Sequence, residues 1–270
     1  MKTKAFRKHK KVWDICPAEE YAAEFARDLN VSPILAQVLI NRDISDKETA
    51  KNFLSPKLVD LIPPEEMPGA SDAANQILEA IRKNKRIAIY GDYDVDGITS
   101  TAILWHLMTI LGADVEFYIP HRIDEGYGLN NDAIRQLAES GVDLIVTVDC
   151  GINAFGAADL AAELNVKLII TDHHQVADGK LPAAAAVVHP LLDDYTNPDS
   201  AGAMVAFKLA WAMVKQIQGN RQTPPELKQY LLNATTLAAI GTIADVVDLR
   251  GENRVLTSYG LKAVTNSELT

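Results

Sequence analysis

The chain has 270 residues, of which 48% are hydrophobic and 23% charged, and its net charge is −10 at pH 7. These values are ordinary for a globular protein and exclude disorder as an overall description. No run of 18 apolar residues occurs, so the sequence predicts no membrane-spanning helix and no membrane partner.

Basic residues are concentrated at the start of the chain. Six lysines and arginines precede Asp14, the first acidic residue, and we interpret this basic arm as a solvated tail, with a phosphate-contacting arm as the alternative. The remaining sequence is strongly acidic, which is not typical of a general nucleic-acid binder and is compatible with a metal site or a local phosphate site. Cys16 and Cys150 form no metal-binding or disulfide motif and fit a reducing cytoplasm.

A small helical region is predicted first along the chain. Apolar residues recur at helical spacing over 15–29 and over 32–41. The proline-rich segment 61–69 interrupts this pattern, so we place a domain boundary at residue 70. Residues 1–70 are therefore expected to form a helical N-terminal region that includes the basic arm.

From residue 71 onward, helical segments alternate with short apolar strands. The predicted strands are 86–90, 114–119, 144–148, 167–170 and 185–188, and the predicted helices are 71–83, 98–111, 132–140, 153–164, 203–217, 225–233 and 255–265. This alternation indicates right-handed βαβ units. The expected fold class for residues 71–270 is α/β, with a parallel sheet flanked by helices on both faces.

Acidic residues and histidines follow three of these strands. The three clusters are the aspartates at 92, 94 and 96, the single Asp149, and the run Asp172, His173 and His174. Because the carboxyl ends of parallel strands lie at one edge of a sheet, we expect the clusters to meet in one crevice.

The first cluster resembles the start of an EF-hand loop, but the twelfth position of such a loop should be glutamate and is Ile103 here. We expect Gly97 to let the chain turn into a helix whose first amides are free to bind phosphate. Thr99 and Ser100 in that turn are candidate substrate-binding residues together with Gly97. A structural alternative for Asp96 alone is that it caps the helix.

The histidine pair at 173 and 174 is a candidate for metal chemistry. Adjacent side chains on an extended backbone point to opposite sides, so one ring would bind metal while the other faces substrate or a supporting group. The remaining histidines are interpreted as structural or solvated, with a minor substrate role open for the third: His9, His106, His121 and His189.

A further carboxylate, Asp245, lies in an otherwise apolar run, where it needs a partner or a metal. Oxygen and imidazole ligands favour Mn²⁺ or Mg²⁺, with zinc as the alternative. Several carboxylates and a histidine can hold two ions, which activate water for displacement at phosphorus. The expected reaction is hydrolysis of a phosphoester or phosphoanhydride. Nucleotide-binding glycine loops and a GxSxG nucleophile motif are absent from the sequence.

These clusters resemble the DHH phosphoesterase superfamily, which is named for an Asp-His-His run like that at 172–174. Within it, the sequence is most similar to the RecJ family of bacterial single-strand-specific exonucleases. The segments that carry this resemblance are 89–100, 120–129, 148–152, 171–174, 200–209 and 241–254.

The resemblance implies a two-metal hydrolase that releases 5′-mononucleotides from single-stranded DNA in the 5′→3′ direction, in DNA recombination and repair. It implies His174 and Asp92 as catalytic residues, with Asp92 either a metal ligand or a carboxylate that supports the ligands, and Arg122 as part of the nucleotide pocket. It also implies two Mn²⁺ or Mg²⁺ ions as cofactors and single-stranded DNA as partner, with single-strand-binding protein and a RecQ-type helicase as candidate protein partners. The implied metal ligands are Asp94, Asp96, Asp149, His173 and Asp245.

RecJ proteins are longer than this sequence, and their DHH-associated and OB-fold domains, expected to supply much of the positive channel for a single strand, are not found in it. Two alternatives remain open. One is a different DHH hydrolase acting on oligonucleotides, cyclic dinucleotides or pyrophosphate, although such relatives typically carry a histidine a few residues before the paired aspartates, where this chain has Tyr90 four residues before Asp94. The other is an inactive replication scaffold.

Overall fold

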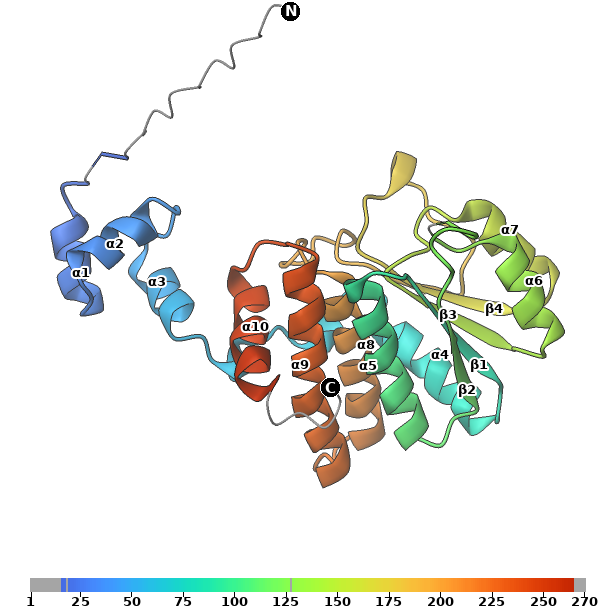
Figure 1. Cartoon of the computed structure of the whole chain (residues 1–270). Helices are drawn as coiled ribbons and strands as arrows, with labels where there is room; N and C mark the ends of the chain where they lie inside the picture. The colour runs from blue at the N-terminus through green and yellow to red at the C-terminus, as the bar shows by residue number, and fades with distance from the viewer. Residues whose placement is uncertain (1–15, 18, 127, 265–270) are drawn as a thin grey trace, which may run out of the picture. The chain divides into compact units, whose positions relative to one another are not determined.

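The computed structural model describes residues 16–17, 19–126 and 128–264 (Figure 1), and the basic arm lies outside them. The chain divides into two compact units at Ser55 and Pro56. This division comes earlier than the predicted boundary at residue 70, because Leu61 and Met67 are buried in the main core of the second unit.

The first unit is helical in its described residues, with α1 (Ala22–Leu29), α2 (Pro33–Ile40) and α3 (Lys47–Leu54). The sequence predicted the first two helices but not α3, which begins where the carboxylate of Asp46 accepts the Thr49 amide at 2.8 Å. The unit has its own small core of Phe25, Ala26, Ala36, Leu39, Ile44 and Ala50.

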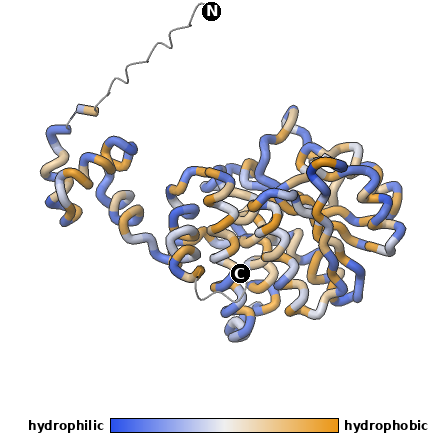
Figure 2. Tube along the Cα trace, viewed as in Figure 1, coloured by the Kyte–Doolittle hydropathy of each residue, from blue (hydrophilic) through white to orange (hydrophobic). Residues whose placement is uncertain are grey.

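A parallel sheet lies at the centre of the second unit (Figure 1), with strand order β2-β1-β3-β4-β5 in the described part of the chain. Hydrophobic residues follow the strands through the interior (Figure 2). The strands are β1 (Ile87–Gly91), β2 (Val115–Tyr118), β3 (Leu144–Val148), β4 (Lys167–Thr171) and β5 (Ala186–Val188).

Helices cover both faces of this sheet, as predicted. Ile87 and Ile89 of β1 face one core, while the alternate residues Ala88 and Tyr90 face the other, as the two-residue period of a strand requires. The first core is covered by α4 (Ala70–Arg82), α5 (Val95–Ile110), α8 (Gly202–Gln218), α9 (Pro225–Ala244) and α10 (Gly251–Ala263), and the second by α6 (Asn131–Glu139) and α7 (Phe155–Glu163). Short 3₁₀ segments are η1 (Leu58–Asp60), η2 (Pro64–Glu66) and η3 (Ala177–Gly179).

Two helices differ from the prediction in ways that bear on the site. The helix expected to start at 98 begins at Val95, because Asp94 Oδ1 accepts the Gly97 amide at 2.9 Å and caps it. The helix expected to end at 233 continues to Ala244. Gly241 lies inside it and packs closely against α8 and α5.

The order of the strands places a ligand-binding edge between β1 and β3. From β1 the chain adds β2 on one side of the sheet and then β3, β4 and β5 on the other. Gly91, Val148 and Thr171 are aligned in register at the ends of their strands. Such a switch in strand order is where open α/β sheets bind ligands. Among the described residues, no helix is long and apolar enough to cross a membrane.

Candidate metal centre

The structure brings the clusters at the ends of β1, β3 and β4 together with Asp245 from the end of α9. Within each of three groups, the potential ligand atoms lie within 4.8 Å of one another. Asp149 belongs to two of the groups and His173 to two, so the groups form one continuous centre. The groups are Asp92, Asp94 and Asp149; Asp149, His173 and His174; and Asp96, His173 and Asp245.

Asp149 is the central carboxylate. It is buried and its φ of 61° places it in the left-handed region, which aspartate adopts more readily than most residues other than glycine. Its Oδ1 lies 3.1 Å from His173 Nε2, and neither atom has a hydrogen-bond partner in the described structure. Burial, together with the nearby charge of Asp96, raises the pKa of Asp149. A divalent cation would supply the partner that both buried atoms lack.

Asp96 joins the centre to the start of α8. Its two carboxylate oxygens accept the amides of Gly202 at 2.6 Å and Ala203 at 2.8 Å. Asp96 therefore caps a helix, as the structural alternative held, but that helix is α8 and not the one on which Asp96 lies. Burial raises the pKa of Asp96 to about 6, against the effect of these amide donors. Its Oδ2 lies 3.7 Å from His173 Nε2, and Asp245 Oδ2 lies 3.8 Å from His173 Nδ1.

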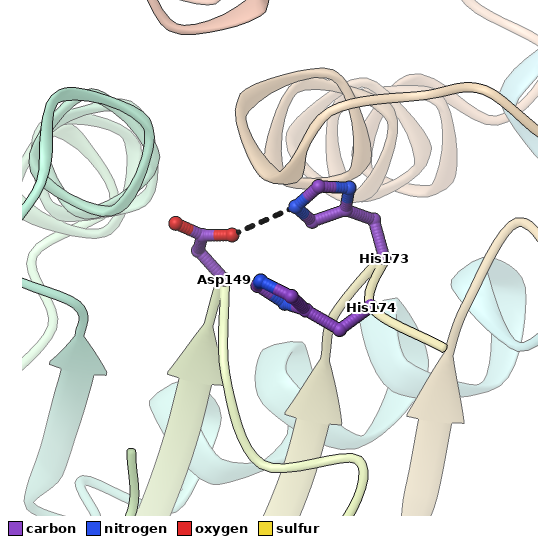
Figure 3. Close-up of side chains that lie close together, drawn as sticks. All are labelled: Asp149, His173 and His174. Atoms are coloured by element: carbon purple, nitrogen blue, oxygen red, sulfur yellow. Dashed lines mark ion pairs between the residues drawn. The ribbon is translucent and has the colours of Figure 1, made fainter. Parts of the chain in front are cut away.

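The two histidines face the same carboxylate. The chain bends at His174, and both rings are directed toward Asp149 (Figure 3), with ring centres 4.5 Å apart. The rings do not point to opposite sides, because the backbone beyond β4 is no longer extended, while the predicted division of roles between metal and substrate stays a prediction.

Asp172 orients this pair, although the sequence analysis gave it no role of its own. Its Oδ1 lies 2.7 Å from His174 Nδ1 and accepts the His173 amide at 2.7 Å, while its Oδ2 accepts the Ile152 amide at 2.9 Å. The hydrogen bond from His174 to Asp172 raises the pKa of His174. It also fixes the orientation of the His174 ring at the centre.

Asp92 and Asp94 complete the centre at the end of β1. Asp92 is buried, its Oδ1 has no hydrogen-bond partner within the described residues, and burial raises its pKa. Asp94 is exposed and caps α5. Gly97 allows this arrangement, because a Cβ there would lie 2.5 Å from the carbonyl oxygen of Asp92.

The residues predicted to bind phosphate at the start of α5 have contacts within their own helix and its cap. The Gly97 amide is bonded to Asp94, and the Thr99 hydroxyl donates to the Val95 carbonyl at 2.8 Å. Ser100 is fully buried. These three residues lie inside a helix that starts earlier than expected, and their substrate-binding role stays a prediction.

Arg122 lies beside the centre and outside the three ligand groups. This exposed residue follows β2, and its guanidinium carbon lies 5.1 Å from the ring centre of Tyr93, between Asp92 and Asp94 in sequence. Its charge acts on Asp92, whose pKa it lowers against the larger effect of burial. The structure thus places Arg122 where it can meet an anionic substrate; its role stays a prediction.

Two glycines that the sequence analysis did not single out set how closely the helices approach the carboxylates. A Cβ at Gly202 would lie 2.7 Å from Asp149 Oδ1, and one at Gly241 would lie 2.6 Å from Asp96 Oδ1. Only glycine fits at such distances. The available signal was a glycine inside an apolar helical pattern, which often has a packing reason.

The sequence is similar to those of a known protein family. The model of the DHH family, N-terminal domain, matches residues 86–242. The single-stranded-DNA-specific exonuclease RecJ of Bacillus subtilis strain 168 is 42% identical over 253 residues, which are 93% of this chain and 30% of that protein.

Solved structures of RecJ proteins are similar to this chain in fold and in sequence. RecJ from Thermus thermophilus in complex with Mn²⁺ gives a TM-score of 0.74 at 36% identity, over 92% of this chain and 34% of that one. The same protein in complex with Mg²⁺ gives 0.62 at 34% identity, over 92% and 30%. The chain thus spans about a third of the length of these relatives. Since the family match covers the ends of β1, β3 and β4, where the carboxylates and histidines converge, the chain belongs to the DHH family.

Proposed function

We propose that this chain is the catalytic part of a metal-dependent phosphodiester hydrolase, a 5′→3′ exonuclease that releases 5′-mononucleotides from single-stranded DNA. The observation that carries the proposal is the set of three ligand groups, which Asp149 and His173 link into one centre. Shared carboxylates are typical of two-metal sites that cleave phosphodiesters. The substrate class comes from the relatives, which are named single-stranded-DNA-specific exonucleases.

The donor set fits two ions of the Mn²⁺ or Mg²⁺ type. One ion would be held by Asp92, Asp94 and Asp149, and the other by His173 with Asp96 and Asp245. When bound, such ions lower the pKa of water and neutralise charge on a phosphate. The relatives solved with Mn²⁺ and with Mg²⁺ support both choices.

The chain's own residues would orient the substrate and hold a proton. The His174 side chain is 43% exposed, so it can reach a phosphate while Asp172 fixes its Nδ1. Its Nε2 can then exchange a proton with water or a leaving oxygen. Arg122 would bind a phosphate oxygen beside the centre, since it is exposed and close to Tyr93.

The resemblance and the DNA substrate suggest a cytoplasmic protein whose partners are single-strand-binding protein and a RecQ-type helicase. Tyr90 argues against the other DHH hydrolases considered above. Its hydroxyl lies 3.0 Å from the Gly128 carbonyl and 3.1 Å from Asn130 Nδ2, so it anchors a loop and belongs to none of the ligand groups.

The test is calorimetric titration with Mn²⁺, followed by assay of a 5′-labelled single strand, with pyrophosphate and a dinucleotide as competing substrate classes. We expect two bound ions, and Asp149→Asn should lose activity by about 100-fold or more, beyond the loss usual for groups that only support a ligand. Asp159→Asn, an exposed change on α7, is the matched control. Wild-type metal binding and turnover in Asp149→Asn would overturn the proposal.

A further inference from the structure

His189 follows β5 in the way that Asp149 follows β3 and Asp172 follows β4. Val188 pairs with Thr171 in the parallel ladder, so the residues that follow them, His189 and Asp172, start from neighbouring positions. His189 is fully buried although it is titratable, and the metal centre proposed above does not include it. A buried imidazole ring needs hydrogen-bond partners, and these partners indicate what the residue does.

We propose that His189 is a positioning residue that holds the bend at His173 and His174, and through it the direction of both metal-facing rings. The predicted effect of His189 on metal binding rests on the proposed function, whereas its effect on the bend does not. The contact that carries it is the hydrogen bond between His189 Nε2 and the backbone carbonyl of His174, at 2.9 Å.

The partners of the His189 ring fix its tautomer. Nδ1 lies 3.1 Å from the Leu191 amide, which can only donate, so Nδ1 is the acceptor. The proton is therefore on Nε2, which donates to a carbonyl that can only accept. Burial lowers the pKa of His189, in agreement with a neutral ring that has one donor and one acceptor.

His174 is consequently held on both sides of its backbone. The Asp172 amide donates to the Val188 carbonyl at 3.2 Å, in continuation of the strand pairing. Beyond that point the chain bends, and hydrogen bonds from the side chains of His189 and Asp172 replace the strand pairing. Asp172 accepts the His174 amide at 3.2 Å and holds its ring, while His189 binds its carbonyl. Releasing the carbonyl would let the bend relax and turn the His173 and His174 rings away from Asp149.

A pair of nearly isosteric variants separates this role from simple packing. His189→Gln keeps an N–H donor near the position of Nε2, whereas His189→Met has a similar length and no donor. Both variants lose the acceptor for the Leu191 amide, so their thermal unfolding reports that shared loss. We expect His189→Gln to bind Mn²⁺ nearly as the wild type does, and His189→Met to bind it about 10-fold more weakly or worse, as for other groups that orient a metal ligand.

A second readout needs no metal. In the metal-free chain, the carbonyl ¹³C signal of His174 and its ring ¹⁵N signals should match the wild type in His189→Gln and shift in His189→Met. Equal metal binding and equal spectra in the two variants would overturn the proposal, as would weak binding in a folded His189→Gln protein. If His189→Met does not fold, the proposal is judged on His189→Gln: binding and spectra like those of the wild type support it, and weakened binding in the folded variant overturns it. If the wild type binds no Mn²⁺, the proposed function fails, and the spectra still decide the role of His189.

Discussion

Gly241 shows how a missing side chain can support a catalytic centre. A Cβ on this residue would lie 2.5 Å from both Ala203 Cβ and Thr99 Oγ1, and 2.6 Å from Asp96 Oδ1. These atoms belong to α8 and α5, so α9 packs against both helices at the point where Asp96 enters the centre. Any larger residue would have to move the carboxylate, a helix, or both.

We predict that Gly241→Ala lowers the free energy of unfolding by about 1–3 kcal/mol, the usual cost of overpacking. The same change should weaken Mn²⁺ binding, because Asp96 is displaced from the amides of Gly202 and Ala203. Urea denaturation and calorimetry measure the two effects.

Gly156→Ala is the matched control for this prediction. Gly156 also lies in a helix, α7, but a Cβ there meets no atom within 4 Å. Alanine should stabilise it by roughly 0.5–1 kcal/mol, because glycine loses more backbone entropy on folding. If Gly241→Ala were as stable as Gly156→Ala, the close packing of α9 on Asp96 would be contradicted.

At the scale of elements, a buried ion pair joins α8 to α10. The Lys208 ammonium is completely buried and donates to Glu252 and to the Ile62 carbonyl. Glu252 also accepts the Ile62 amide at 2.9 Å and the Tyr195 hydroxyl at 3.0 Å. The pair therefore ties the segment before α4 and the loop before α8 to α10, which follows the turn bearing Asp245.

We predict that Lys208→Met lowers the free energy of unfolding by about 3–5 kcal/mol, because it leaves the Glu252 carboxylate buried without its cation. The double variant Lys208→Met with Glu252→Gln should be more stable than Lys208→Met alone, since no uncompensated charge remains. Urea denaturation of both variants and of Glu252→Gln completes the cycle. Losses that simply add would argue against a coupled pair.

The elements also show what a sequence can reveal. Strands β1, β3 and β4 were predictable because short apolar runs end at aspartates, and their parallel order alone implies that these aspartates meet. The start of α5 was not predictable, because Asp92, Asp94 and Asp96 look equally like a loop. The extension of α9 from Asn233 to Ala244 was not predicted, and the packing reason for the glycine inside it, Gly241, appears only in its contact with Asp96. The role of His189 required the pairing of β5 with β4, which no local pattern contains.

At the scale of the whole molecule, carboxylates from Asp92 to Asp245 are gathered into one largely buried centre of an acidic chain, with Asp94 exposed at its edge. Burial raises the pKa of Asp92, Asp96, Asp149 and Asp245. These raised pKa values mean that the ionised carboxylates are less stable in the centre than in water. The donors at α8 reduce that cost, and bound cations would reduce it further. All of these groups lie in the second unit.

We therefore predict that residues 56–270 fold without the first unit and bind Mn²⁺ with the stoichiometry of the full chain. This fragment contains the sheet, the hydrophobic cores on both of its faces and every proposed metal ligand. Residues 1–55 alone should unfold at a much lower temperature, because their core within the described residues is small and a chain of this length buries little surface. Circular dichroism melting and calorimetry compare the fragments with the full chain. A fragment 56–270 that melts early or fails to bind Mn²⁺ would show that the first unit is needed to form the centre.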